Sequence, residues 1–213
     1  KELLDLLEVV GDESRGLDER FQSAYARICE GLAQEGIRIL TERDVERHSP
    51  ELIPWLHAYF HEEVLPHLVP IILVPGRPFP PLKDGALYFG IKMWGRHARF
   101  AILELPAMLP RFVKLPNNDI MYVDDVIRHQ LNEIFYIFKY ERIEAFEFKI
   151  SRDAELDIDN DFSEGYIRKM RKVLEQRKGG RPTRLVYDAV MPAGLLRAIV
   201  QGMGLDTEDT MIG

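Results

Sequence analysis

The sequence predicts an α+β protein, with a helical N-terminal part over residues 1–66 and a mixed domain over residues 67–213. Up to about residue 66, apolar residues recur at steps of three and four, which is the spacing of amphipathic helices. From residue 69 the pattern changes to short apolar runs separated by prolines and glycines, which indicates strands and turns. Strands and helices then alternate around one hairpin, as in an α+β domain rather than a doubly wound sheet.

The N-terminal part is predicted to hold three helices. Two apolar stripes define the first two, and their members are Leu3, Leu4, Leu7 and Val10, then Phe21, Tyr25, Ile28 and Leu32. Gly36 is the kind of glycine that ends a helix. The third helix is expected to start with Ser49 as N-cap and Pro50 in the first position, and to stop at Pro66.

The second part begins with a strand, "PIIL", followed by a proline-rich loop. Residues 86–105 predict a hairpin, with Gly95 in the turn and alternate residues of the first strand on one face. Residues 119–135 predict a strand that runs into a helix, with Asp124 as its N-cap. Further on we expect a strand at 143–151, a helix at 162–177, a strand at 183–187 and a helix at 192–203.

The ends of the sequence indicate a piece of a longer protein. Lys1 starts within a helical pattern and is not preceded by a methionine. The last residues, "DTEDTMIG", show no pattern of a terminal element.

Composition excludes several classes. Hydrophobic content of 46% and charged content of 30% are typical of a globular chain, not of a disordered or collagen-like one. The net charge of −7 argues against general binding of nucleic acid or anionic membranes. A single cysteine, Cys29, excludes an internal disulfide, and its place in an apolar helical stripe predicts a buried small residue rather than a nucleophile. No apolar run is long enough to span a bilayer.

An acidic stretch, "SRDAELDIDND" at residues 151–161, is the first candidate for chemistry. Asp157, Asp159 and Asp161 have the one-three-five spacing of a calcium loop. The sixth loop position is Phe162 instead of glycine, and the twelfth is Arg168 instead of glutamate, so the match fails. A helix N-terminus fits better, because Asp161 and Glu164 have the spacing of a capping box.

A basic cluster follows the acids. Eight Lys and Arg residues lie between residues 168 and 184, opposed only by Glu175. Only two or three of them are needed to complement the helix dipole at the C-terminal end of the predicted helix. The surplus is either a solvated face or a polyanion contact. The candidates for such a contact are Arg168, Lys169, Arg171, Lys172, Arg181 and Arg184.

Histidines and aromatic residues give weaker signals. His57 and His61 are four apart on a helix, so they could share a metal ion, but position 58 is Ala58 instead of the metalloprotease glutamate. No third ligand is evident, so we predict an exposed helix edge and no metal site. Trp55, Trp94 and the aromatic run at 134–138 are predicted to lie in the core rather than to form a stacking platform.

The order of several motifs resembles the bacterial polyphosphate kinases of the phosphohistidine type. The segments are "ILVPGRPFPPL", "LPAMLPRFVKLP", "VDDVIRHQLNEIF", "FEFKISRDAELDID", "RPTRLVYDAVMPAGLL" and "GLDTED", of which "PRFVKLP" and "SRDAELDID" are the most specific. The resemblance runs from about Gly36 onward. It implies the end of that family's N-terminal helical domain followed by its middle, or head, domain.

The resemblance implies a parent enzyme that transfers phosphate from ATP to polyphosphate through a phosphohistidine, with Mg²⁺ assisting and at least a dimer as its assembly. The nucleophile, the magnesium site and the adenine contact would all lie outside this sequence, so no catalytic or cofactor-binding residue is assigned here. The head domain would serve in dimerisation and in shaping the polyphosphate channel. A cytoplasmic enzyme is expected, and a peripheral position at the inner membrane face stays open. The alternative is a stand-alone module that binds polyanions or proteins without catalysis.

Overall fold

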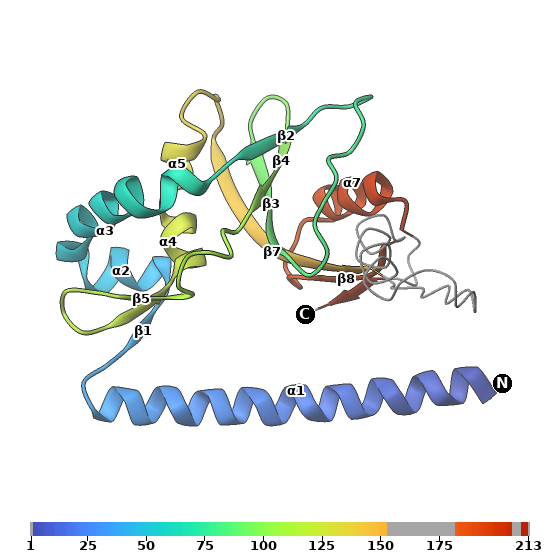
Figure 1. The fold of residues 1–213 in the computed structure, drawn as a ribbon, viewed down its shortest axis with the longest axis horizontal. Helices are drawn as coiled ribbons and strands as arrows, with labels where there is room; N and C mark the ends of the chain where they lie inside the picture. The colour runs from blue at the N-terminus through green and yellow to red at the C-terminus, as the bar shows by residue number, and fades with distance from the viewer. Residues whose placement is uncertain (1, 153–181, 206–209, 213) are drawn as a thin grey trace, which may run out of the picture. The chain divides into compact units, whose positions relative to one another are not determined.

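A computed structural model describes residues 2–152, 182–205 and 210–212 (Figure 1). The chain forms two compact units, described separately below: a first unit of residues 1–56 and 110–126, and a second unit of residues 57–109 and 127–213. Helices and mixed sheets occur together, so the predicted α+β class is confirmed.

The first unit combines helices with a small sheet. Its elements are α1 (Glu2–Gln34), β1 (Ile39–Leu40), α2 (Glu42–His48), η1 (Pro50–Leu52), β5 (Phe112–Lys114) and β6 (Ile120–Tyr122). The strand order is β1-β6-β5, with β1 parallel to β6 and β5 antiparallel to it. Two further helices, α3 (Ile53–Tyr59) and α4 (Val123–His129), begin in this unit.

The two predicted N-terminal helices are a single helix, α1, which continues through Gly11 and Gly16. It ends as predicted, because Gly36 has φ 75° and the amide of Ile37 donates to the carbonyl of Leu32 at 2.9 Å. The second apolar stripe is partly open to solvent, since Phe21 is 65% exposed. Cys29 is half-buried and free.

Helix α2 was not predicted from the sequence. Its N-cap, Thr41, forms a capping box with Asp44, whose amide donates to the Thr41 hydroxyl at 3.3 Å and whose carboxylate accepts from the Thr41 amide at 2.9 Å. Ser49 precedes a short 3₁₀ turn and its side chain makes no cap hydrogen bond. Asp124 is not the N-cap of α4, because the helix begins at Val123; its carboxylate accepts from Arg111 at 2.8 Å.

An ion pair with a buried carboxylate joins Arg38, directly before β1, to the turn before β6. The side chain of Asp119 is 2% exposed and accepts from Arg38 Nη2 at 2.6 Å, from the Arg38 amide at 2.8 Å and from Asn117 Nδ2 at 2.8 Å. Burial raises the pKa of the Asp119 carboxyl, but the hydrogen bonds and charge of Arg38 and the bond from Asn117 outweigh it, so this pKa lies below its ordinary value.

The second unit is built on a six-stranded sheet. Its strands are β2 (Pro70–Leu73), β3 (Leu87–Trp94), β4 (Arg99–Glu104), β7 (Arg142–Arg152), β8 (Pro182–Tyr187) and β9 (Thr210–Ile212). Their order is β2-β4-β3-β7-β8-β9, and only the β8–β9 pair is parallel. The predicted hairpin is β3–β4. Strand β9 is a terminal element that the sequence pattern did not indicate, because three residues are too few to show a period.

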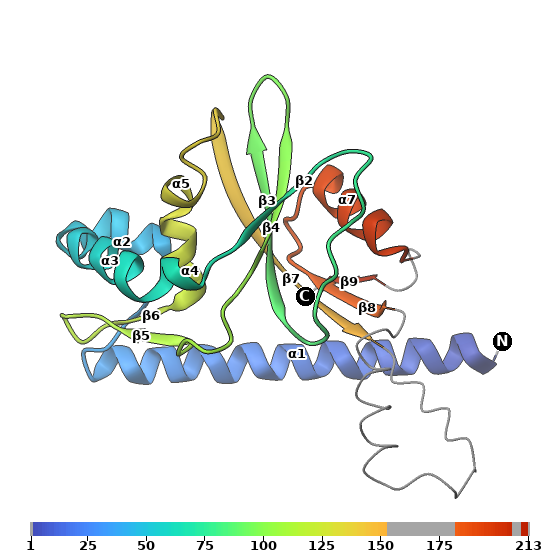
Figure 2. The same cartoon turned by 45° about the horizontal axis from the view of Figure 1, so that its top comes forward.

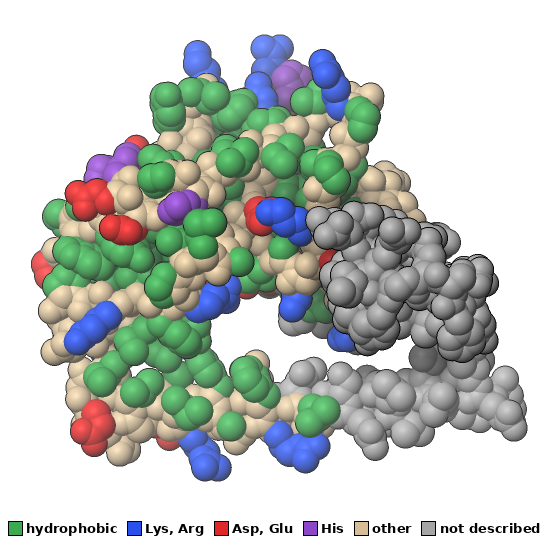
Figure 3. All heavy atoms as spheres, in the orientation of Figure 1, with side chains coloured by type: hydrophobic (Ala, Val, Ile, Leu, Met, Phe, Trp, Pro, Cys, Tyr) green, Lys and Arg blue, Asp and Glu red, His purple; other side chains and the backbone are tan. Residues whose placement is uncertain are grey.

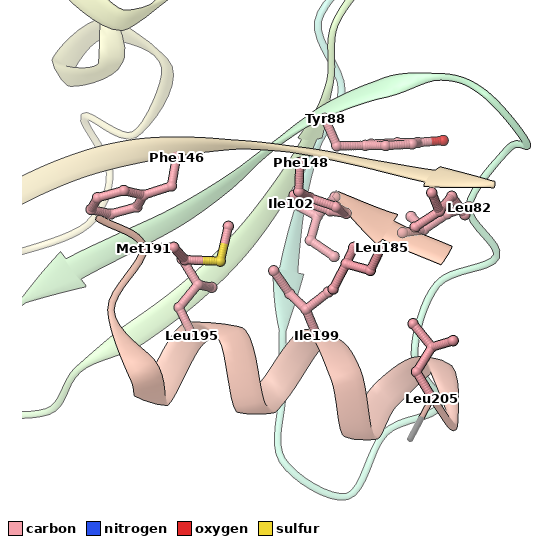
Figure 4. Packing of buried hydrophobic residues seen from close by; sticks show 11 residues of the cluster. Leu82, Tyr88, Ile102, Phe146, Phe148, Leu185, Met191, Leu195, Ile199 and Leu205 are labelled. Atoms are coloured by element: carbon pink, nitrogen blue, oxygen red, sulfur yellow. The ribbon is translucent and has the colours of Figure 1, made fainter. Parts of the chain in front are cut away.

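Helices of this unit include the end of α3, the π-helical turn η2 (Phe60–Val64), the 3₁₀ turn η3 (Leu65–His67), α5 (Leu131–Ile134) and α7 (Ala193–Met203). Helix α7 packs on the sheet through a buried apolar cluster that includes Ile102, Phe148, Leu185, Leu195 and Ile199 (Figure 4). Gly90 permits this approach: a Cβ added there would lie 3.1 Å from Ile199 Cδ1. None of the described helices is long and apolar enough to cross a membrane.

Candidate polyanion-contact surface

Most of the predicted polyanion contacts lie outside the described residues. These are Arg168, Lys169, Arg171, Lys172 and Arg181, together with the acids from Asp153 to Asp161. Arg184 is described: it lies on β8, opposite Ser151 of β7, and is exposed. The polyanion contact of this basic cluster therefore stays a prediction.

A second group of cations lies in the described part of the second unit, at the end of the β3–β4 hairpin and in the loop before β7. We call it the hairpin-end surface, and its cations are Lys92, Arg96, Arg99, Lys139 and Arg142. Figure 2 shows the hairpin turn and the start of β7 at the same end of the sheet. Blue side chains gather at this end in Figure 3, at the top of the view.

Backbone contacts hold the hairpin turn against the loop before β7. The amide of Glu141 donates to the carbonyl of Trp94 at 2.7 Å, and Arg99 Nη1 donates to the carbonyl of Lys139 at 3.4 Å. A Cβ on Gly95 would lie 3.6 Å from the Cα of Tyr140, so the two segments are in close contact. Arg99 also lies over the ring of Phe138, at 5.8 Å from its centroid. These contacts fix the position of Arg99 and hold the two cation-bearing segments together.

Trp94 lies at this surface and is half-buried: it packs against the apolar core cluster of the second unit, as predicted, and its ring also faces two cations. Lys92 Nζ lies 4.5 Å from the centroid of its ring and Arg142 Cζ lies 3.9 Å from it. Strand geometry explains this, because Lys92 and Trp94 are two residues apart on β3, and Arg142 is directly opposite Trp94 on β7. Cations over the face of a tryptophan are attracted by its quadrupole.

The aromatic run at 134–138 is likewise divided. Phe135 is fully buried, as predicted, but Tyr136 is 79% exposed. Helix α5 ends at Ile134 with Phe135 as its C-cap, so the residues after Phe135 follow a loop and do not share one buried face. Sequence alone gave no sign of this helix end, because no glycine or proline marks it.

The charge of the hairpin-end surface is positive, since its five cations are opposed by Glu141 and Glu144 in the same segments. Arg142 Nη1 lies 3.7 Å from Glu144 Oε1, and the two side chains are 58% and 40% exposed. An exposed pair of this kind is weak. Arginine donors remain available on the surface, and guanidinium groups bind phosphate oxygens in a bidentate manner. The surface can therefore bind an anionic chain without performing any bond-making step.

One cluster of three metal-ligating side chains occurs among the described residues: His57, His61 and Glu133. Two of its three donors are imidazole nitrogens, whereas Mg²⁺ prefers oxygen ligands in octahedral geometry. The cluster therefore does not suit the magnesium ion that the family resemblance implies. His57 and His61 lie on the predicted helix edge.

Comparisons with known proteins decide the family. The family model "Polyphosphate kinase middle domain" matches residues 53–213. The chain belongs to this family. The polyphosphate kinase of Vibrio cholerae serotype O1 is 30% identical over 219 residues, which cover 97% of this chain and 30% of that protein. The polyphosphate kinase of Escherichia coli K12 is 28% identical over 205 residues, covering 92% of this chain and 29% of that protein.

A solved structure agrees with these matches. The crystal structure of polyphosphate kinase from Porphyromonas gingivalis superposes with a TM-score of 0.69 and 26% sequence identity. The match covers 91% of this chain and 28% of that one. The chain thus spans about 30% of the length of the polyphosphate kinases it resembles. The resemblance seen in the sequence is confirmed.

Proposed function

We propose that this chain is a non-catalytic part of an ATP:polyphosphate phosphotransferase, in which it provides subunit contacts and part of the path of the polyphosphate chain. Membership of the polyphosphate kinase middle-domain family supports the parent activity. In this proposal the parent transfers the γ-phosphate of ATP to a histidine and from there to polyphosphate, so that one difficult displacement is divided into two. ATP, Mg²⁺ and the reactive histidine belong to other parts of the parent protein.

The hairpin-end surface carries the proposal about polyphosphate. The ring of Trp94 contacts both Lys92 and Arg142 and so fixes two cations in place; Arg96 in the turn and Arg99 at the start of β4 add two more. Polyphosphate is a flexible chain with closely spaced charges. Several cationic side chains that are already fixed at one end of a hairpin lose less side-chain entropy on binding it than mobile cationic side chains would. Arg184 and the basic cluster before it are proposed to extend the same function.

The location of the reactive histidine can be tested in the full-length protein. The protein would be incubated with ATP labelled at the γ-phosphate and digested under conditions that preserve phosphohistidine, and the labelled peptide would be identified by mass spectrometry. We expect the label outside residues 1–213. Stoichiometric label on any of the six histidines of this chain would refute the assignment of a non-catalytic role.

The polyphosphate contact needs a separate experiment. In the full-length protein, Arg96, Arg99 and Arg142 would be changed together to Gln, and affinity for long-chain polyphosphate would be measured from low to high NaCl. Each lost phosphate contact should reduce the steepness of log K against log salt by about 0.7, taking the value for single-stranded nucleic acids as a guide. We expect binding weaker by at least tenfold at low salt and a slope shallower by about two.

The control variant is Arg77→Gln with Arg197→Gln, which removes exposed cations elsewhere in the second unit. If the triple variant and the control had the same salt slope, the hairpin-end surface would have no part in binding. Size-exclusion chromatography with light scattering would distinguish a subunit contact. Loss of the oligomer in the triple variant, with polyphosphate affinity retained, would assign the surface to subunit association instead.

A further inference from the structure

The strongest unassigned group in the second unit is the cluster of His57, His61 and Glu133. Each residue offers one ligand atom, and these atoms all lie within 4.8 Å of one another. The imidazole centroids of the two histidines are 4.3 Å apart, and His61 Nε2 lies 3.9 Å from Glu133 Oε2. At metal–ligand distances of about 2.0–2.2 Å, two tetrahedral ligand atoms lie roughly 3.4 Å apart, so small rotations of these side chains suffice to bind one ion.

The backbone fixes this arrangement. His57 lies on the last turn of α3, and the chain then enters the π-helical turn η2, in which the amide of Leu65 donates to the carbonyl of Phe60. Phe60 and Val64 are fully buried on either side of His61, and Leu131 and Phe135 are buried on either side of Glu133. The ring of Phe60 packs edge-on against that of His61. Isolated π-turns of this kind are frequent at functional sites.

The hydrogen bonding of His61 is incomplete. Its Nε2 atom is buried and has no hydrogen-bond partner among the residues that the structure describes, although the side chain as a whole is 38% exposed. The distance of 3.9 Å to Glu133 is too long for a hydrogen bond. A buried polar atom without a partner is destabilising, and an ion between Nε2 and the carboxylate would remove this penalty. The geometry therefore favours a bound ion over a direct contact of the two side chains.

We infer that His57, His61 and Glu133 bind a divalent ion of the zinc class, which links η2 to α5. Two imidazole nitrogens and one carboxylate oxygen are a donor set that suits Zn²⁺ and Co²⁺, whereas Ca²⁺ and Mg²⁺ prefer oxygen alone. Glu133 is 47% exposed and His57 is exposed, so water can complete a four-coordinate site. This inference does not depend on the proposed transferase activity, since the ion would stabilise the junction of two helical segments.

The test uses Co²⁺ as a spectroscopic probe on the full-length protein after treatment with a chelator. Tetrahedral Co²⁺ absorbs strongly in the visible, so a site of this kind gives a signal that an octahedral surface ion does not. The variants are His61→Gln and the combination of His57→Gln with Glu133→Gln. His67→Gln, an exposed histidine on η3, is the matched control. Melting temperature without metal would show whether each variant is folded.

We expect one equivalent of Co²⁺ to bind with a tetrahedral spectrum in the unchanged protein and in His67→Gln, and Zn²⁺ to displace it. His61→Gln should weaken binding by at least tenfold, and the double variant should abolish the signal. We also expect Zn²⁺ to raise the melting temperature of the unchanged protein and not that of the double variant. An identical spectrum and stoichiometry in the double variant, or only octahedral binding in the unchanged protein, would overturn the inference. A ligand variant that fails to fold without metal would be replaced by Glu133→Gln alone, for which the same tenfold loss is expected.

Discussion

Removal of the Asp119 carboxylate should loosen the small sheet of the first unit more than any other single change of charge there. In Asp119→Ala, the amide and guanidinium of Arg38 and the side chain of Asn117 each lose an acceptor. Because Asp119 is buried, the loss is expected near the range for breaking a buried ion pair, about 3–5 kcal/mol. The lower value is favoured, since half of the Arg38 side chain is exposed and water can reach it.

Hydrogen exchange measures this locally, without requiring the whole protein to unfold. The amide of Ile120 donates to the carbonyl of Arg38 at 2.8 Å, and the amide of Leu115 donates to the carbonyl of Asp119 at 2.8 Å. A loss of about 3 kcal/mol corresponds to exchange faster by about 100-fold at these amides. Glu51→Gln is the control, because it removes an acid whose charge acts on Arg38 without removing a hydrogen bond. Unchanged exchange in Asp119→Ala would refute the reasoning that this pair holds β1 against β6.

Three further changes test other parts of the fold. Gly202→Val should displace the loop around Phe79, because a Cβ at Gly202 would lie 2.1 Å from Phe79 Cδ2. We expect the free energy of unfolding to fall by about 1–3 kcal/mol and residues 75–81 to be cleaved faster by protease. Protease resistance equal to that of the unchanged protein would contradict this. Thr41→Ala should cost about 1 kcal/mol and speed amide exchange in α2, whereas exchange unchanged there would mean that the capping box is not formed. Lowering the pH from 6 to 3 should destabilise the first unit, because the carboxyl pKa values of Asp44 and Asp119 lie below their ordinary values. The stability that these two carboxylates contribute is present above about pH 4. It is lost as the pH falls through their lowered pKa values. Urea midpoints at the two pH values measure this, and an unchanged difference in Asp119→Asn would exclude Asp119 as a source.

The sequence predicted most strands because their periods were long enough to recognise. Strand β3 has eight residues and its alternation gave the hairpin directly. The end of α1 was also predictable, since Gly36 alone accounts for it. Strands β1 and β9, of two and three residues, carry no usable period, and their pairing depends on partners distant in sequence.

The sites could be predicted only in part from the sequence, because they depend on contacts between segments that are distant along the chain. Glu133 is 72 residues from His61, so spacing on one helix could not reveal it as a third ligand. The placement of Arg142 over Trp94 depends on the register of β3 with β7, which no local pattern specifies. The segment "TERD" does carry a signal for α2, because Thr41 and Asp44 have the spacing of a capping box.

Strand β2 is the last strand on its side of the sheet in the described part of the chain. It has only four residues, it starts with Pro70, which has no amide to donate, and Pro75 follows shortly after its end. A short edge strand of this kind offers few backbone N–H and C=O groups to a strand of another molecule, so it disfavours edge-to-edge association between copies. The prolines at this point are therefore expected to disfavour pairing of β2 with the same strand of another copy.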